Sequence, residues 1–99
     1  MRPSARFLDD VRAIVLGRLA GHAADVYLFG SWARGDARQI SDIDVAIRAR
    51  RPLPIALLSE IREALSESHI PYPVDIVDLN DVSPSFRARI LSEGVRWTA

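Results

Sequence analysis

Two residue types are missing from this sequence, cysteine and lysine, and each absence removes a class of chemistry. Without cysteine the chain can form no disulfide, offers no thiolate nucleophile and cannot bind zinc through sulfur. All 13 basic residues are arginine, so a lysine Schiff base and a phosphate-binding lysine are excluded as well. These absences narrow the chemistry that is available to the chain.

An excess of charge and a long apolar run are also lacking. The 13 acidic residues balance the 13 basic ones, so no overall field favours a nucleic acid or an anionic membrane as a partner. No apolar segment is long enough for a membrane span or for the hydrophobic part of a signal peptide. We therefore expect a cytoplasmic protein with no membrane association and no direct nucleic-acid binding.

The length and the composition limit the size of the hydrophobic core. The chain has 99 residues, of which 48% are hydrophobic, and this is enough for one modest core. The sequence has no internal repeat and no low-complexity tail. We expect a single domain over residues 1–99, and a large two-domain enzyme is excluded.

The spacing of the apolar residues predicts an alternation of helices and strands. Apolar positions recur at three- and four-residue steps in the expected helices and alternate in the expected strands. The predicted order is a helix at 4–19, a strand at 26–29, a short helix at 31–37, a strand at 41–49, a helix at 57–68, a strand at 74–79 and a helix from Ser83-Pro84 to Gly94. This order indicates an α/β fold, in which a small mixed sheet of three or four strands is covered by about four helices.

The stretch GSWARGDARQISDIDVAI, residues 30–47, carries two aspartates that are separated by one residue. Because strand side chains alternate between faces, Asp42 and Asp44 point the same way, with their carboxylates roughly 6–7 Å apart. Two neighbouring anions repel each other, and a divalent ion such as Mg²⁺, which takes oxygen ligands, would relieve this repulsion. The alternative is that one carboxylate pairs with an arginine, Arg34 or Arg38, on a solvated face.

A glycine and a serine, Gly30 and Ser31, come before these aspartates, and ten residues lie between Ser31 and Asp42. A glycine at a strand end lets a ligand approach the backbone, and a serine that opens a helix offers amides and a hydroxyl to phosphate oxygens. If the two strands are antiparallel, the end of the first lies beside the start of the second. Phosphates at Ser31 would then lie next to metals at Asp42 and Asp44, which is the arrangement of two-metal phosphoryl or nucleotidyl transfer.

Such a site usually has a third carboxylate, which completes the coordination and accepts the proton of the attacking hydroxyl. Asp75 and Asp78 are the candidates, but alternation places them on opposite faces of their strand, so only one can face the site. We favour Asp75, because it lies early in its strand, as Asp42 and Asp44 do, and the strand starts adjoin if those strands are parallel. Asp78 would then face outward or cap the loop before Asp81.

These motifs, in this order and spacing, resemble the signature of the minimal nucleotidyltransferase family, which is Gly-Ser, ten residues, then Asp-X-Asp. Residues 28–31, 33–35 and 41–44 carry the signature, while 74–77 and 90–95 resemble the third-carboxylate strand and the closing segment of that family. The resemblance covers most of the chain. It implies a polymerase-beta-like nucleotidyltransferase fold and an enzyme that uses a nucleoside triphosphate, ATP, together with magnesium.

The resemblance also implies roles for individual residues. Asp42 and Asp44 are expected to hold the metals, two Mg²⁺ ions, and Asp75 to be the third ligand and the base. Gly30 and Ser31 are expected to bind the distal phosphates of the nucleotide.

Two neighbours of this motif have open assignments. Arg34 either reaches a nucleotide phosphate or bridges to Asp36 or Asp42 as a structural contact. Trp32 occupies a position that is often polar or basic in the family, so the resemblance assigns it no role, and packing is the simpler interpretation of it.

Family members are commonly the antitoxin of a toxin-antitoxin pair, and their partner is a helical HEPN ribonuclease toxin. The resemblance therefore implies an adenylyltransferase that moves AMP from ATP to a tyrosine hydroxyl of such a toxin. Two alternatives remain open. The first alternative is a binding module that neutralises a toxin by contact without catalysis. The second is a stand-alone transferase that acts on a small hydroxyl compound.

Overall fold

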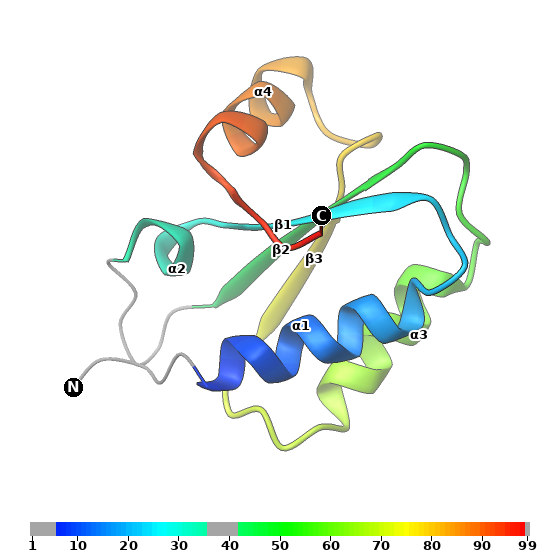
Figure 1. Ribbon diagram of the computed structural model, residues 1–99, viewed down its shortest axis with the longest axis vertical. Helices are drawn as coiled ribbons and strands as arrows, with labels where there is room; N and C mark the ends of the chain where they lie inside the picture. The colour runs from blue at the N-terminus through cyan, green and yellow to red at the C-terminus, as the bar shows by residue number, and fades with distance from the viewer. Residues whose placement is uncertain (1–5, 36–41, 99) are drawn as a thin grey trace.

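The computed structural model describes residues 6–35 and 42–98. Within these residues the chain forms four helices and four strands, in the order α1 (Arg6–Arg18), β1 (Ala24–Phe29), α2 (Ser31–Arg34), β2 (Ile43–Ala49), α3 (Leu57–Ser66), β3 (Val74–Asp78), α4 (Pro84–Glu93) and β4 (Val95–Arg96). Helices α1 and α3 lie side by side over one face of the sheet, and α4 lies over the other (Figure 1). The short helix α2 sits at the end of the sheet where β1 ends.

The four strands form one mixed sheet in the order β3-β2-β1-β4. β1 and β2 are antiparallel, with Phe29 opposite Asp44, whereas β2 and β3 are parallel, with Asp44 opposite Asp75. β4 pairs antiparallel with β1. The pairing directions that a shared site requires are therefore confirmed. The expected α/β class with a small mixed sheet is confirmed too, and the sheet has four strands, the larger of the two numbers expected.

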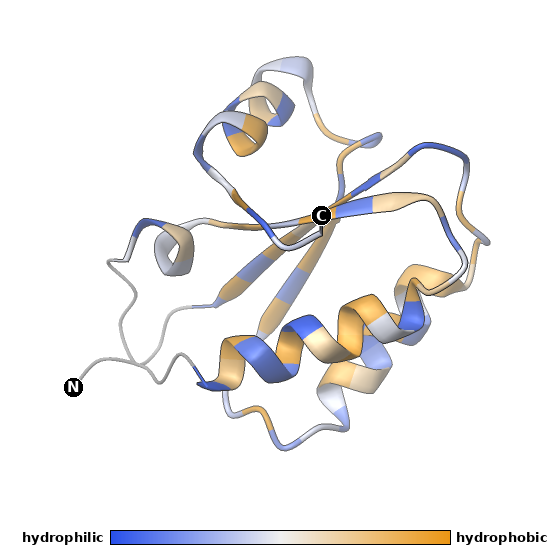
Figure 2. Ribbon diagram, viewed as in Figure 1, coloured by the Kyte–Doolittle hydropathy of each residue, from blue (hydrophilic) through white to orange (hydrophobic). Residues whose placement is uncertain are grey.

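The core lies mainly between the sheet and the pair α1 and α3. Along β2, Ile43, Val45 and Ile47 are fully buried and belong to the cluster that includes α1 and α3. The alternate positions face α4, where Ala46 packs with Tyr27. Figure 2 shows the resulting alternation of hydrophobic and hydrophilic residues along β2 and β3. Strand alternation thus gives one face to the large core and leaves the other face for polar groups.

Most predicted boundaries agree with the structure within two residues. β2 begins at Ile43, so Asp42 lies directly before the strand rather than inside it, and α3 ends at Ser66 rather than Ser68. The predicted N-cap of α4 is confirmed, because the Ser83 hydroxyl accepts a hydrogen bond of 3.3 Å from the Phe86 amide. The short helix α2 ends at Arg34 rather than at residue 37, because Gly35 caps it in a left-handed conformation. The predicted helix start at residue 4 and the strand start at Ser41 lie outside the described residues.

Strand β4 has only two residues, too few to leave a specific signal in the sequence. It can form because Gly94 brings the end of α4 close to β1. A Cβ atom at this glycine would lie 2.6 Å from the Ile90 carbonyl oxygen and 3.2 Å from that of Leu28. Any side chain here would push the last turn of α4 away from the sheet and disrupt the pairing of Val95 with Leu28.

Three aromatic rings join α1, α2 and the loop before β3. Trp32 is buried and contacts Tyr72 edge-on, with the ring centroids 5.0 Å apart, and Tyr72 contacts Phe7 in the same way at 5.7 Å. The role of Trp32 is therefore packing, and this packing fixes α2 against the segment that leads into β3. None of the described helices has the length and apolar character needed to cross a membrane.

The packing of α3 gives a direct test of this architecture. Ile61 in α3 is fully buried, whereas Ile55, just before α3, is fully exposed. We expect Ile61→Ala to lower the free energy of unfolding by about 2–5 kcal/mol, because it leaves a cavity in the core. Ile55→Ala is the matched control and should change it by less than about 0.5 kcal/mol. Urea unfolding of both variants measures this, and equal effects would contradict the position of α3.

Candidate active site

The ends of three strands place one glycine and two aspartates in a row across the sheet. β1 ends at Phe29, directly before Gly30, and Phe29 lies opposite Asp44 at the start of β2. Asp44 in turn lies opposite Asp75 near the start of β3. Paired residues point to the same face, and neighbouring strands are only about 4.8 Å apart. Asp44 and Asp75 therefore share the α4 face of the sheet, and Gly30 lies beside them at the edge of the sheet where β1 ends and β2 and β3 begin.

Gly30 makes direct contact with Asp44. A Cβ atom built on this glycine would collide with Oδ2 of Asp44 and lie 3.1 Å from its Cγ. The glycine also has a φ of 75°, in the left-handed region that other residues rarely adopt. Both the lack of space and the backbone conformation thus require glycine here. The Asp44 carboxylate is the group that leaves no space for a side chain.

Helix α2 begins directly after Gly30 and has only four residues. The Arg34 amide donates to the Gly30 carbonyl at 3.1 Å, and Gly35, with a φ of 79° and a left-handed conformation, ends the helix. Backbone N–H groups in the first turn of a helix have no acceptor inside the helix. The first turn of α2 therefore has N–H donors without a partner inside the helix, and it begins directly after Gly30, which contacts Asp44.

The electrostatics of this edge centre on Asp44. Burial raises the pKa of Asp44 above its ordinary value, and the negative charges of Asp75 and then Asp42 raise it further, while the positive charge of Arg34 lowers it. The side chain is only half-buried, so solvent still reaches it. A carboxylate in these surroundings has a strong affinity for a proton or for a cation.

The structure separates the two candidates for the third carboxylate. Asp75 is exposed on the same face as Asp44. Asp78 lies three residues further along β3, opposite Ile47, and its Oδ1 accepts a 2.9 Å hydrogen bond from the Asn80 amide. Asp78 thus caps the loop that follows β3, as expected, and is remote from the row of Gly30, Asp44 and Asp75.

The remaining predicted residues lie around this row. Asp42 is exposed, directly before β2, and its charge acts on Asp44. Arg34 is also exposed at the end of α2, and its charge acts on the same carboxylate. Both expected roles of Arg34, as a phosphate ligand and as a partner of a carboxylate, are compatible with this position. The other arginine that the sequence offered as a partner, Arg38, lies outside the described residues.

The donor set fits a hard divalent cation. Asp42, Asp44 and Asp75 supply only oxygen ligands, which magnesium prefers, and the raised pKa of Asp44 reflects its burial first and then the negative charges of Asp75 and Asp42. In the part of the chain that the structure describes, however, no three His, Cys, Asp or Glu side chains are close enough together to form a metal site. The carboxylates are adjacent in register, but their side chains do not converge on one point.

A cavity of about 190 Å³ adjoins this edge, between the end of β1, α2 and α4. It is lined by Phe29, Gly30, Arg34, Phe86, Arg89 and Glu93, among others. No sequence motif pointed to a function for these residues of α4. A signal was present, because Phe86, Arg89 and Glu93 are spaced by three, four and seven residues and so share one side of the helix. What the spacing could not show is that this side faces Gly30.

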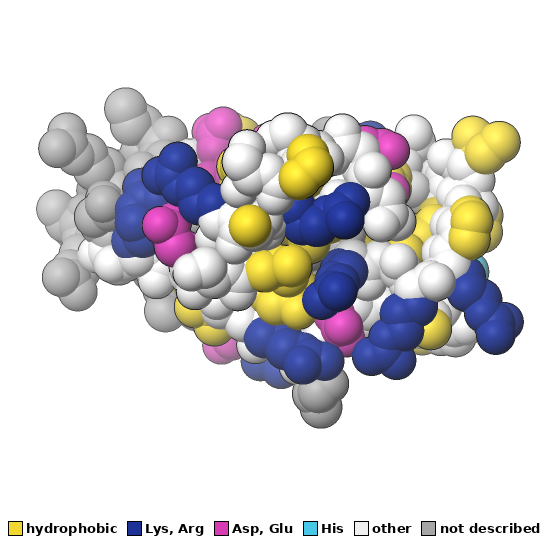
Figure 3. Space-filling view, turned by 90° about the horizontal axis from the view of Figure 1, so that it is seen from above, with side chains coloured by type: hydrophobic (Ala, Val, Ile, Leu, Met, Phe, Trp, Pro, Cys, Tyr) yellow, Lys and Arg dark blue, Asp and Glu magenta, His cyan; other side chains and the backbone are white. Residues whose placement is uncertain are grey.

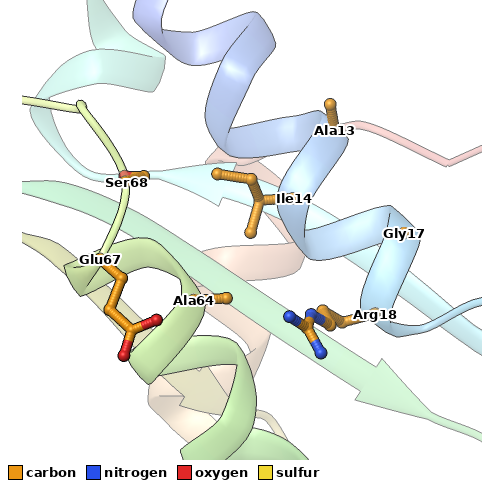
Figure 4. A pocket seen from close by; sticks show the side chains of 7 residues that line it. All are labelled: Ala13, Ile14, Gly17, Arg18, Ala64, Glu67 and Ser68. Atoms are coloured by element: carbon orange, nitrogen blue, oxygen red, sulfur yellow. The ribbon is translucent and has the colours of Figure 1, made fainter.

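A second hollow, of about 600 Å³, lies on the opposite side of the sheet, in the groove between α1 and α3. Figure 4 shows Arg18 of α1 on one side and Glu67 after α3 on the other, with the small side chain of Ala64 between them. Because α1 and α3 cover the face opposite Asp44 and Asp75, this groove is separated from the carboxylates by the sheet.

Comparison with known proteins agrees with this geometry. Residues 21–97 match the family described as polymerase beta, nucleotidyltransferase. The chain belongs to this nucleotidyltransferase family. Among solved structures, one described as a candidate minimal nucleotidyltransferase is 32% identical, with a TM-score of 0.76, and the match covers 95% of this chain and 96% of that one. The resemblance found in the sequence motifs is thereby confirmed.

Two further similarities concern proteins with a described activity or partner. A Haemophilus influenzae protein named "Probable protein adenylyltransferase MntA" is 40% identical over 62 residues, which are 63% of this chain and 54% of that protein. The chain spans about half the length of the first curated relatives it matches. A solved structure of a toxin-antitoxin with AMP-PNP is 27% identical, with a TM-score of 0.71, over 89% of this chain and 73% of that one.

The raised pKa of Asp44 predicts that the stability of this nucleotidyltransferase depends on pH. The folded protein binds the Asp44 proton more tightly than the unfolded chain does, so this carboxyl costs no stability at a pH below its ordinary pKa. The cost appears as the pH rises through the raised folded pKa. We therefore expect Asp44→Asn to raise the melting temperature at neutral pH in the presence of chelator, and this gain to disappear in acid.

The control for this experiment is Asp81→Asn, which neutralises an exposed aspartate in the loop after β3. It should leave the melting temperature nearly unchanged at both pH values. Thermal unfolding of the wild type and the two variants from acid to neutral pH measures the effect. A lower melting temperature of Asp44→Asn at neutral pH would show that the surroundings stabilise the charged carboxylate, which is the opposite of what its raised pKa predicts.

Proposed function

We propose that the chain is a magnesium-dependent nucleotidyltransferase that acts as an antitoxin, transferring AMP from ATP to a tyrosine hydroxyl of a HEPN-type toxin. Membership of the nucleotidyltransferase family supports the reaction class. The similarity to a protein named as an adenylyltransferase supports AMP as the transferred group. The similarity to a toxin-antitoxin with AMP-PNP supports a nucleotide substrate and a toxin partner, and the motif resemblance favours a HEPN protein as that partner.

The observation that carries this proposal is the row of Gly30, Asp44 and Asp75 across three adjacent strands. Transfer of a nucleotidyl group needs donors for the leaving phosphates, charge beside the reacting phosphorus and an acceptor for the proton of the attacking hydroxyl. The row supports this reaction class. In the proposal the start of α2 supplies the donors, a cation held at Asp44 would supply the positive charge, and Asp75 on the other side accepts the proton.

The proposed reaction is an in-line displacement at the α-phosphorus of ATP. The acceptor oxygen forms a bond to this phosphorus, the bond to the bridging oxygen of the β-phosphate breaks, and pyrophosphate leaves with the electron pair. The hydroxyl proton passes to the Asp75 carboxylate. Gly30, Ser31 and Arg34 hold the β- and γ-phosphates, so the leaving group departs toward the start of α2.

Asp42, Asp44 and Asp75 would hold the magnesium in this proposal. When bound, magnesium supplies positive charge that offsets both the phosphate oxygens and the repulsion among the three carboxylates. The chain itself supplies the rigid spacing between the phosphate donors and the proton acceptor, because the strand register fixes Gly30, Asp44 and Asp75 relative to one another.

The two aspartates of β3 allow a matched test of the catalytic assignment. Asp75→Asn removes the proton acceptor and should lower the transfer rate by about 10²–10⁴-fold. Asp78→Asn keeps an oxygen for the hydrogen bond from the Asn80 amide and should retain most of the activity. Transfer of labelled AMP to the toxin measures both rates, and the reverse order of activities would assign the third carboxylate to Asp78.

Turnover distinguishes a catalyst from an inhibitor that acts by contact. A sub-stoichiometric amount of this protein, with ATP and magnesium, should add one or more AMP groups to a HEPN toxin, and the toxin should stay inactive after separation. Chelator should prevent the mass increase. Intact-mass spectrometry of the toxin measures the outcome, and the double variant Asp42→Ala with Asp44→Ala is the control.

A contact inhibitor would behave differently in the same experiment. It would leave the toxin mass unchanged, would need about one copy per toxin, and would tolerate the double variant, because occlusion makes no covalent change. Full neutralisation at an equimolar ratio with an unchanged toxin mass would therefore refute the proposed reaction.

A further inference from the structure

The cavity between β1, α2 and α4 shares two residues with the proposed phosphate site. Gly30 and Arg34 line both, and Phe29, which lines the cavity, lies opposite Asp44 in the β1–β2 register. With a volume of about 190 Å³, the cavity is smaller than a site for a whole ligand of drug size, roughly 300–1,000 Å³. It suits one ring system of a ligand whose remaining part lies on the carboxylates.

The direction of the reaction indicates which part of the ligand reaches this cavity. In the proposed displacement, the acceptor approaches from the side of Asp75 and pyrophosphate leaves toward Gly30 and Ser31. The nucleoside stays bonded to the α-phosphorus and extends from it at an angle to this line. The sheet, with α1 and α3 on its far side, closes the space beneath the nucleoside. The space above the carboxylates on the α4 face remains, and the cavity adjoins it, because Phe29 lies opposite Asp44 and Gly30 contacts Asp44.

The cavity presents an aromatic surface. Phe86 of α4 is 39% exposed, and its ring meets that of Phe29 at an angle of 80° with the centroids 6.0 Å apart. Among the described residues, only Ile55, Phe86 and Val95 are large hydrophobic side chains with this degree of exposure. Phe86 is the one aromatic residue of these three and the one that lines the cavity, and an exposed ring next to a phosphate site suits stacking with a base.

The rim of the cavity carries charge of both signs. Arg89 and Glu93 form an ion pair of 3.4 Å along α4, with side chains that are 67% and 52% exposed. An exposed pair of this kind contributes little to stability, so either partner can turn to a ligand at small cost. Figure 3, which views the molecule from the side of α4, shows basic and acidic side chains close together among hydrophobic ones on this surface.

We infer that this cavity binds the purine base of the nucleotide, with Phe86 stacked on the base and the Glu93 carboxylate accepting a hydrogen bond from its exocyclic amino group. The inference rests on the proposed function, because it assumes that a triphosphate lies at Gly30 and Ser31. Phe86 and Glu93 are then specificity-determining residues of the reaction. Helix α4, which carries none of the motif's carboxylates or phosphate donors, thereby takes a direct part in substrate recognition.

The test compares ligands with and without a base. Titration calorimetry in magnesium measures the dissociation constants of ATP and of inorganic tripolyphosphate for the wild type and for Phe86→Ala. We expect Phe86→Ala to weaken ATP binding by about tenfold, since the base loses its stacking partner, and to leave tripolyphosphate binding unchanged. Phe86→Tyr, which keeps a ring, should restore most of the ATP affinity. Val95→Ala removes an exposed hydrophobic side chain outside the cavity and should change neither constant.

Base selectivity gives a second measurement on the same variants. The wild type should bind ATP more tightly than UTP, because a pyrimidine has a smaller stacking surface and uracil has no exocyclic amino group. Phe86→Ala and Glu93→Ala, which removes the acceptor oxygens, should both reduce this preference. If Glu93 only pairs with Arg89, Glu93→Ala would leave the ratio unchanged, and the assignment of Glu93 would be overturned.

Three outcomes would overturn the inference, and they differ in meaning. If both ligands bind and Phe86→Ala binds ATP as the wild type does, the base lies elsewhere and the proposed function is unaffected. If Phe86→Ala raises only the KM for the protein acceptor, the cavity receives the acceptor. If the wild type binds neither ATP nor tripolyphosphate, the proposed function fails, and the inference fails with it.

Discussion

The candidate site depends on holding carboxylates together against their mutual repulsion. Burial, Asp75 and Asp42 all raise the pKa of Asp44 and so disfavour its charged form, and the positive charge of Arg34 offsets them only in part. The carboxylates cannot separate freely, because Asp44 and Asp75 sit opposite each other in a parallel ladder and Asp44 also pairs with Phe29. The free energy gained by the hydrophobic core beneath β2 therefore offsets the repulsion among these carboxylates. Holding the carboxylates together in this way costs stability, and a bound cation would relieve their repulsion.

The aromatic cluster explains how the two halves of the site keep their relative position. Gly30 and α2 belong to the segment between β1 and β2, whereas Asp75 belongs to β3, and the loop before β3 carries Tyr72. Trp32 in α2 contacts Tyr72, so the side of the site at Gly30 and the side at Asp75 are joined by a ring contact as well as by the sheet. A large apolar residue inside a polar motif therefore has a structural reason. It anchors a helix of four residues that is too short to be stable alone.

Most of the fold and the main row of the site could be predicted from the sequence. Strand alternation separated Asp75 from Asp78, and the spacing between Gly30 and the two aspartates required antiparallel strands, because these features depend on local geometry. The sequence could not show that α4 turns Phe86 and Glu93 toward Gly30, since this depends on tertiary packing and on the close approach at Gly94. For the same reason β4 had no specific signal. Its two residues pair only because α4 ends beside β1.

Part of the arginine content also has a structural explanation. Three guanidinium groups donate to main-chain carbonyl groups that lie far away in the sequence or after a strand: Arg12 to Trp97 at 2.7 Å, Arg62 to Ile76 at 2.9 Å and Arg87 to Leu79 at 2.9 Å. β3 is an edge strand, and the contact from Arg62 in α3 occupies one of its carbonyl groups. A planar guanidinium with several donors can bond a carbonyl and still reach solvent, which a lysine does less well. Part of the basic charge therefore fastens helices to strands and strand ends and protects a sheet edge, so the high arginine content does not require a nucleic-acid partner to explain it.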